Sequence, residues 1–262
     1  MEVVICPSES AVGEVAAAKI AQVAQAVPGA PVLGVATGSS PLGVYRALAE
    51  LVAAGRLQLG EAHVFALDEY VGLPPGHPES YAEVIRRTVT EPLGLDPARV
   101  HVPNGFADDL STAGAAYEDA ISAAGGVDVQ LLGVGANGHV GFNEPTSSLG
   151  SRTRVKTLAR KTREDNARFF DSLDQVPMHC VTQGLGTIMD ARHVVLVAQG
   201  AGKAEAIAAI VEGPVTALWP GSVLQFHPRA TIVIDEPAAS RLKLADYYRE
   251  TDAAKPDWQW FA

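Results

Sequence analysis

Residues 127–139 read Val-Asp-Val-Gln-Leu-Leu-Gly-Val-Gly-Ala-Asn-Gly-His, a short apolar run followed at once by a glycine-rich polar segment. A run of this length bounded by glycine is typical of a strand buried in a parallel sheet. Five further runs have the same character, at 3–6, 31–36, 63–67, 193–198 and 231–234. The chain therefore predicts a sheet that is covered on both faces.

Alanine-rich segments with helical periodicity lie between these runs, at 12–26, 41–54, 112–124 and 202–211. Ser10 is expected to cap the first helix, and Pro41 suits the first turn of the second. This alternation is typical of a Rossmann-like α/β fold, in which a doubly wound, mostly parallel sheet carries helices on both faces. Because no linker or repeat interrupts the 262 residues, we expect a single domain over residues 1–262.

The composition excludes several classes of protein. A formal net charge of −10 argues against a nucleic-acid partner. The chain shows no signal peptide and no apolar run long enough for a membrane span. Two cysteines without a CxxC pair or Cys/His cluster suggest neither a disulfide framework nor a metal. We therefore expect a cytoplasmic protein without a metal, a membrane partner or a nucleic-acid partner; a homo-oligomer is compatible with the sequence.

Polar segments follow four of the predicted strands. In a parallel sheet, ligands bind outside the carboxyl ends of the strands. These four segments, which should open onto one rim, are 37–41, 68–72, 133–139 and 199–203.

The segment Thr37-Gly38-Ser39-Ser40-Pro41 joins a strand to a helix through glycine and hydroxyl residues. Its backbone N–H groups and the positive end of the helix dipole suit an anion, although an ordinary turn capped by Ser39 or Ser40 is the alternative. No Gly-Lys-Ser/Thr follows, so a monophosphate is favoured over a triphosphate. Lys203 lies at the start of a helix, where the helix dipole is unfavourable for a positive charge. Either a bound phosphate or solvation of the ammonium would offset this effect.

Gly133, Gly135 and Gly138 spell the G-x-G-x-x-G pattern of dinucleotide-binding loops. That pattern should open a long helix, but Phe142-Asn143-Glu144-Pro145 interrupts one here, and the expected later acidic residue is missing. The glycines therefore favour another use of the loop, and no nicotinamide or other cofactor is expected.

The same loop carries His139, with Asn137 two residues before it and Glu144 five residues after it. Histidine titrates near neutral pH, and a nearby carboxylate can orient it and raise its basicity. Asp68 ends an apolar strand, where desolvation could turn it into a base. The alternatives are a turn-capping histidine and a loop salt bridge, but the glycines around His139 favour a site.

Several longer motifs resemble glucosamine-6-phosphate deaminases. They are Leu67-Asp68-Glu69-Tyr70-Val71-Gly72-Leu73 with His77-Pro78-Glu79-Ser80-Tyr81, the stretch 133–145, Ser151-Arg152-Thr153-Arg154-Val155-Lys156-Thr157, and Asn166-Ala167-Arg168-Phe169-Phe170. They occur in order across nearly the whole chain. The resemblance implies an enzyme of amino-sugar catabolism that converts D-glucosamine 6-phosphate and water to D-fructose 6-phosphate and ammonia.

The resemblance also implies a role for each matching residue. His139, supported by Asn137 and Glu144, would open the pyranose ring, and Asp68 would move a proton from C2 to C1. The substrate phosphate would lie among residues of three segments. One of these residues, Arg168, would belong to a mobile lid at about 157–177. These phosphate-binding residues are Gly38, Ser39, Ser40, Arg168 and Lys203.

Two departures from the family bear on these expectations. Position 137 is Asn where some members have Asp, so His139 should be less readily protonated than in those members. Ser147, Arg152, Arg154 and Lys156 match the site for the activator N-acetylglucosamine 6-phosphate, but the tyrosine that completes that site has no clear counterpart. The alternative for these basic residues is a solvated surface or a subunit contact, so activation is left open.

Two other functions compete with deamination. One is another enzyme of the same fold, such as a 6-phosphogluconolactonase, and the other is a non-catalytic sugar-phosphate sensor. The presence of both proton-transfer groups, Asp68 and the set around His139, favours ring opening with proton abstraction at C2. The absence of a DNA-binding helix pair or basic appendage argues against a sensor.

Overall fold

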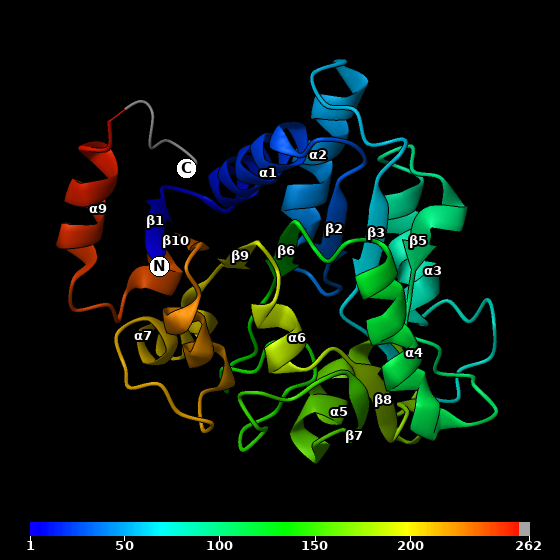
Figure 1. Ribbon diagram of the computed structural model, residues 1–262. Helices are drawn as coiled ribbons and strands as arrows, with labels where there is room; N and C mark the ends of the chain where they lie inside the picture. Colours follow the sequence, from blue (N-terminus) through cyan, green and yellow to red (C-terminus); the bar gives the residue numbers. More distant parts are fainter. Residues whose placement is uncertain (257–262) are drawn as a thin grey trace.

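The computed structural model describes residues 1–256, and within them a seven-stranded parallel sheet forms the centre of the molecule (Figure 1). Every neighbouring pair in this sheet runs parallel. In spatial order, its strands are β1 (Glu2–Cys6), β10 (Ala230–Asp235), β9 (His193–Ala198), β6 (Val129–Leu132), β2 (Val32–Val35), β3 (His63–Ala66) and β5 (Val100–His101).

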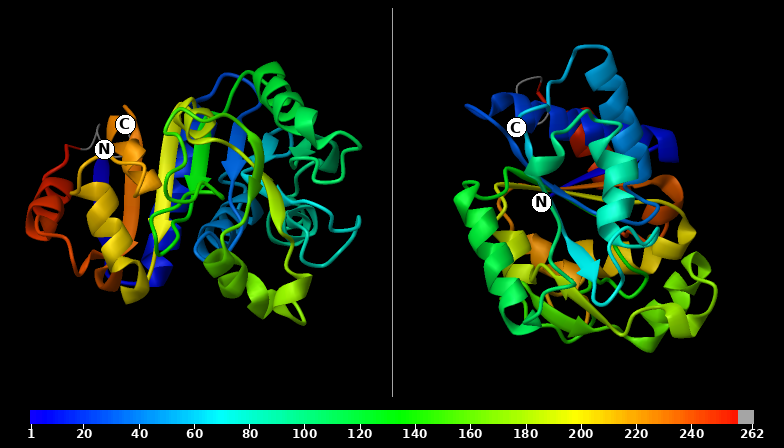
Figure 2. Two further views of the ribbon diagram at one scale, coloured as in Figure 1. Left: turned by 90° about the horizontal axis from the view of Figure 1, so that it is seen from below. Right: turned by 90° about the vertical axis from the view of Figure 1, so that its right-hand side faces the viewer.

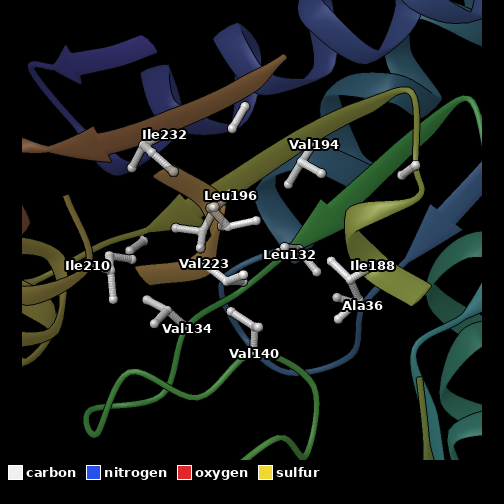
Figure 3. Packing of buried hydrophobic residues seen from close by; sticks show 14 of the residues in the cluster. Ala36, Leu132, Val134, Val140, Ile188, Val194, Leu196, Ile210, Val223 and Ile232 are labelled. Carbon is white, nitrogen blue, oxygen red and sulfur yellow. The ribbon is translucent and has the colours of Figure 1, made fainter. Parts of the chain in front are cut away.

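Alternate residues of these strands pack into two separate cores, one on each face of the sheet. In β9, Val195 and Val197 pack with α1 (Glu9–Ala26) and α2 (Leu42–Ala53). The alternate residues of β9, Val194, Leu196 and Ala198, face the other core, part of which is shown in Figure 3. That core includes residues of α4 (Leu110–Ala123), α6 (Leu185–Met189) and α7 (Ala204–Val211). The predicted doubly wound fold is confirmed.

The order of the strands reverses between β2 and β6. The chain goes outward from β2 to β3 and β5, and then returns to β6 on the other side of β2 before going on to β9 and β10. In open parallel sheets, the crevice at such a reversal is the usual place for a ligand. The segments that leave β2 and β6 here are 37–41 and 133–139, so two of the four predicted polar segments meet at this point.

A second, smaller sheet lies beside the first and was not predicted. Its three antiparallel strands are β4 (Asp68–Tyr70), β8 (His179–Thr182) and β7 (Arg154–Thr157), in that order. The segment 157–177 follows β7 and lies at the periphery of the molecule in both views of Figure 2, coloured yellow-green. It contains α5 (Arg160–Asn166) and two short 3-10 turns, η3 (Ala167–Phe169) and η4 (Leu173–Gln175).

The other described elements complete the cover of the sheet. Helix α9 packs along the edge strand β1 (Figure 1). These elements are α3 (Tyr81–Ile85), α8 (Glu236–Ala239), α9 (Ala245–Ala253), the π-helix η1 (Arg86–Thr90), and the 3-10 segments η2 (Pro97–Arg99), η5 (Ala201–Lys203) and η6 (Pro220–Phe226).

The predicted elements agree with those of the structure to within a few residues, with one correction at a helix start. Ser8, and not Ser10, caps α1, because its side chain accepts the hydrogen bond from the Ala11 N–H at 3.2 Å. Ser10 lies inside the first turn and donates to Glu14 instead, at 2.9 Å. None of the helices within residues 1–256 is long and apolar enough to cross a membrane.

Candidate active site

The segment after β6 forms a compact turn instead of a helix. The Gly135 N–H donates to the carbonyl of His139, and the Gly138 N–H donates to the carbonyl of Gly135, both at 2.9 Å. A dinucleotide-binding loop would continue into a helix whose N-terminus meets the pyrophosphate. The glycine pattern here therefore serves a different purpose, as expected from the sequence.

Two of these glycines are required by what packs against them. A Cβ on residue 135 would lie 2.2 Å from the His139 ring, so only glycine lets the imidazole lie across the turn. Residue 138 has φ of 79°, a conformation that side chains rarely adopt, and a Cβ there would lie 2.6 Å from the Trp219 ring. The turn is thus built to hold His139 in one place.

Asn137, His139 and Glu144 contact one another in this turn. The Asn137 side chain donates to Glu144 Oε2 at 2.7 Å and accepts from the His139 N–H at 3.2 Å. The His139 Nδ1 atom lies 3.6 Å from the same Glu144 oxygen, just beyond hydrogen-bond distance. Glu144 Oε1 accepts a short hydrogen bond from the Thr162 hydroxyl.

Glu144 is held as an anion. Burial raises the pKa of its carboxyl, but the neighbouring His139 side chain and the hydrogen bonds from Thr162 and Asn137 outweigh it and lower the pKa to about 2. The negative charge next to Nδ1 favours the tautomer that carries a proton on that nitrogen. His139 can then exchange protons with a ligand through Nε2.

Asp68 and Glu69 are adjacent buried carboxyls with different surroundings. Glu69 accepts backbone N–H bonds from Tyr70 at 2.7 Å, Tyr81 at 2.9 Å and Ala82 at 2.8 Å, and so caps the start of α3. Asp68 is 5% exposed, and burial together with the charge of Glu69 raises its pKa to about 8. Asp68 is therefore the carboxyl that can titrate near neutral pH.

The turn that carries His139 continues past Asp68. Gly141 lies beside Asp68, because a Cβ on residue 141 would lie 3.5 Å from Asp68 Oδ2 and 3.0 Å from the Thr182 hydroxyl. The hydroxyl of Thr182 also accepts the Phe142 N–H at 3.1 Å, and Thr182 pairs with Asp68 across β4 and β8. Both proton-transfer candidates thus converge from strand ends that are far apart in the sequence.

The candidate phosphate-binding residues come from two neighbouring loops and the peripheral segment. Gly38 and Ser39 are exposed. The backbone carbonyl of Ser40 accepts a hydrogen bond from the Gln199 side chain at 3.2 Å. This bond connects the loop after β2 to the loop that leads to Lys203. The Lys203 ammonium donates to the Val134 carbonyl at 2.7 Å. This hydrogen bond, which was not foreseen, satisfies the ammonium at the helix start.

Arg168 reaches the same region from η3. Burial lowers the pKa of Lys203, the charge of Asp165 raises it, and the positive charge of Arg168 adds a smaller lowering. The Arg168 guanidinium lies 4.7 Å from the centre of the exposed Phe169 ring. Arg168 is exposed, so its charge is accessible to an anionic ligand.

The four residues matched to an activator site do not form one free cluster. Arg152 pairs with Glu118 and Asp190. Arg154 donates to the Asn143 side chain at 2.6 Å. Ser147 is buried, and its hydroxyl has no hydrogen-bond partner within residues 1–256, whereas Lys156 is half-buried in β7. Their use by an activator stays a prediction.

Residues that the motifs did not assign connect the parts of the site. Thr162 contacts Glu144 from α5, and Thr182 contacts the Phe142 N–H from β8. Asn143 donates from its side chain to the carbonyls of Val140 and Gln183. Apart from the contact between Asn143 and Val140, these contacts join residues at least 18 positions apart, so local patterns carried no signal for them. Within residues 1–256, no group of three or more His, Cys, Asp or Glu side chains could hold a metal ion.

The fold and the arrangement of these groups are typical of an α/β enzyme, with a candidate site at the switch point of a parallel sheet. Residues 7–233 match the family of glucosamine-6-phosphate isomerases and 6-phosphogluconolactonases. The chain belongs to this family.

Proteins of several bacteria are similar to the chain over its full length. A protein of Cutibacterium acnes named glucosamine-6-phosphate deaminase is 62% identical over 257 residues, which is 98% of each chain. A protein of Streptomyces coelicolor with the same name is 59% identical over 260 residues, 99% of each chain.

Solved structures agree with this placement. A monomeric glucosamine-6-phosphate deaminase superposes with a TM-score of 0.89 at 39% identity, over 92% of this chain and 100% of its own. The 6-phosphogluconolactonase of Trypanosoma cruzi superposes with a TM-score of 0.72 at 21% identity, over 92% of this chain and 97% of its own. The second likeness concerns the fold alone.

Proposed function

We propose that this protein is a glucosamine-6-phosphate deaminase, which converts D-glucosamine 6-phosphate and water to D-fructose 6-phosphate and ammonia. The observation that carries the proposal is the buried Asp68 carboxyl, which lies beside the His139 turn and has a pKa of about 8. The high identity to bacterial proteins of that name over the full chain supports it. The reaction belongs to the catabolism of amino sugars.

The first step in this proposal is opening of the pyranose ring. Nε2 of His139 takes the proton from the C1 hydroxyl and returns it to the ring oxygen, which leaves an open-chain aldehyde. Glu144 stabilises the imidazolium that forms between the two transfers, and Asn137 holds Glu144 in place.

The second step is proton transfer by Asp68. Its carboxylate removes the proton from C2 and gives an enolamine, and its carboxyl then delivers a proton to C1.

The last step consumes water. The C2 imine that results from protonation at C1 adds water, loses ammonia and becomes the ketone of fructose 6-phosphate. The phosphate of the substrate would be held by Gly38, Ser39, Ser40, Lys203 and Arg168. Residues 157–177 would act as a lid that closes over the substrate with Arg168 and keeps bulk water from the enolamine.

The wider setting follows from the same proposal. We expect the enzyme to work in the cytoplasm as a single domain over residues 1–262, with no cofactor. Activation by N-acetylglucosamine 6-phosphate would use Ser147, Arg152, Arg154 and Lys156. For that, Arg152 would have to leave Glu118 and Asp190, its partners in this structure.

The test is release of ammonia from glucosamine 6-phosphate by the wild type, by Asp68→Asn and by the exposed control Asp108→Asn. The proposal expects release by the wild type and the control, and a loss of at least about a hundredfold in Asp68→Asn, as for removal of a general base. A wild type that releases no ammonia but hydrolyses 6-phosphogluconolactone would make the protein a lactonase. An active Asp68→Asn would remove Asp68 from the role of base.

A further inference from the structure

Thr162 lies in the peripheral segment 157–177, yet its side chain points toward the proton-transfer groups. It is the one residue of α5 that is buried, at 6% exposure. Its hydroxyl donates to Glu144 Oε1, whereas Asn137 and His139 face the other carboxylate oxygen, Oε2. Both oxygens of the Glu144 carboxylate are therefore held by hydrogen bonds, and one of these bonds comes from the segment 157–177.

The helix that carries Thr162 is tied to the rest of that segment. The Arg163 guanidinium donates to the carbonyls of Leu173 and Val176, both at 2.9 Å. Arg168 follows directly in η3, and its charge already acts on Lys203. An anion bound by Arg168 and Lys203 would therefore hold α5, and with it Thr162, against the rest of the site.

We propose that Thr162 is a positioning residue, whose hydroxyl fixes the Glu144 carboxylate beside His139 when the segment 157–177 covers a bound sugar phosphate. This rests on the proposed function and adds a link to it. The segment that would bind the phosphate through Arg168 then also positions the carboxylate that supports ring opening.

The chemistry of the contact explains why a hydroxyl is needed. A hydrogen bond donated to a carboxylate stabilises the anion and lowers its pKa, and the Thr162 bond is one of the causes that hold the pKa of Glu144 at about 2. The β-branch of threonine restricts rotation of its side chain, which helps to keep the hydroxyl oriented toward the Glu144 carboxylate. Without it, the carboxylate is free to turn away from His139 Nδ1, and the imidazolium loses its counter-charge.

The experiment compares Thr162→Val, which keeps the shape and removes the hydroxyl, with Thr162→Ser, which keeps the hydroxyl. Ammonia release should fall about tenfold in kcat for Thr162→Val, the scale of one hydrogen bond to a charged group, with KM changed less than about twofold. Thr162→Ser should restore most of kcat. Ser172→Ala, which removes an exposed hydroxyl from the same segment, is the control and should match the wild type.

A double-mutant cycle with Glu144→Gln makes the test specific. If Thr162 acts through Glu144, Thr162→Val should cost less than about twofold in the Glu144→Gln background. Independent, multiplying losses would overturn the proposal, and so would a Thr162→Ser enzyme as impaired as Thr162→Val, because that result indicates packing. An active wild type with an unchanged Thr162→Val also overturns it and leaves the proposed function standing. Only a wild type that releases no ammonia would contradict the proposed function itself.

Discussion

The side-chain amide of Asn143 donates to the carbonyl of Gln183 at 2.8 Å and to that of Val140 at 2.9 Å. The backbone N–H of Gln183 donates to the carbonyl of Leu67 at 2.8 Å, and its side-chain amide donates to the carbonyl of Ala66 at 3.1 Å. Ala66 is the last residue of β3, and Leu67 directly precedes Asp68. Asn143 has no exposed surface. The turn that carries His139 and the strand that ends at Asp68 are thus parts of one buried hydrogen-bonded framework.

Replacing Asn143 by Leu, which has a similar shape, should destabilise the fold. The carbonyls of Val140 and Gln183 would each lose one of their two donors, and the half-buried Arg154 guanidinium would lose its acceptor. A neutral hydrogen bond contributes about 0.5–1.5 kcal/mol and one to a charged group about 1.5–3 kcal/mol, so we expect a loss of about 3 kcal/mol in the free energy of unfolding. Urea denaturation measures it. The exposed Asn104→Ala should change stability by less than about 1 kcal/mol, and equal effects at both positions would refute the framework.

The pH dependence of turnover should follow Asp68. Burial, and then the charge of Glu69, raise its pKa from 3.8 to about 8. A base must be ionised to accept a proton, and raising the pKa keeps Asp68 protonated over a wider pH range. The value of kcat/KM for glucosamine 6-phosphate should therefore rise with pH and reach half its plateau near pH 8 in the free enzyme. A plateau already reached by pH 6 would rule out Asp68 as the titrating base.

Glu69 should tune this profile without taking part in the reaction. Its negative charge is the second cause of the raised pKa of Asp68, so Glu69→Gln should lower that pKa and move the half-maximum of kcat/KM to lower pH. The amide keeps one acceptor oxygen for the N–H groups at the start of α3, and about 1–2 kcal/mol of stability should be lost. The pH profile and a thermal melt measure the two effects. A shift to higher pH would show that the charge of Glu69 does not reach Asp68.

Six strands of the main sheet could be predicted because burial on both faces demands continuous apolar strands, as in His193–Ala198, whereas the two-residue edge strand β5 could not. The small antiparallel sheet could not. Its strand β4 is only Asp68–Tyr70, whose acidic residues are disfavoured in strands, and it forms because β8 pairs with it from more than a hundred residues away. The cap of α1 was misplaced by two residues because Ser8 and Ser10 are both good capping residues, and only the backbone shows which one precedes the helix.

In the site, sequence motifs identified the groups on each strand end but not what holds them. Asn137, His139 and Glu144 lie within eight residues, so their proximity follows from a short turn. The contact between Thr162 and Glu144 and the contact between Gln183 and Ala66, 117 residues apart, depend on how the two sheets pack. Arg152 illustrates the converse case, since its motif matches a ligand-binding position but Glu118 and Asp190 engage it here.

Gly135→Ala should separate the conformation of His139 from the stability of the fold. The added Cβ would lie 2.2 Å from Cε1 and 2.4 Å from Nδ1 of the imidazole, so the ring must move off the turn and away from Glu144. Residue 135 has no positive φ, so the backbone itself tolerates alanine. We expect kcat for ammonia release to fall by at least about a hundredfold, because small displacements of a proton-transfer group are costly, while the melting temperature changes little. Gly60→Ala, where a Cβ would meet nothing within 4 Å, is the matched control and should keep wild-type kcat. If Gly135→Ala also keeps wild-type kcat, the position of His139 over the turn does not matter for the reaction.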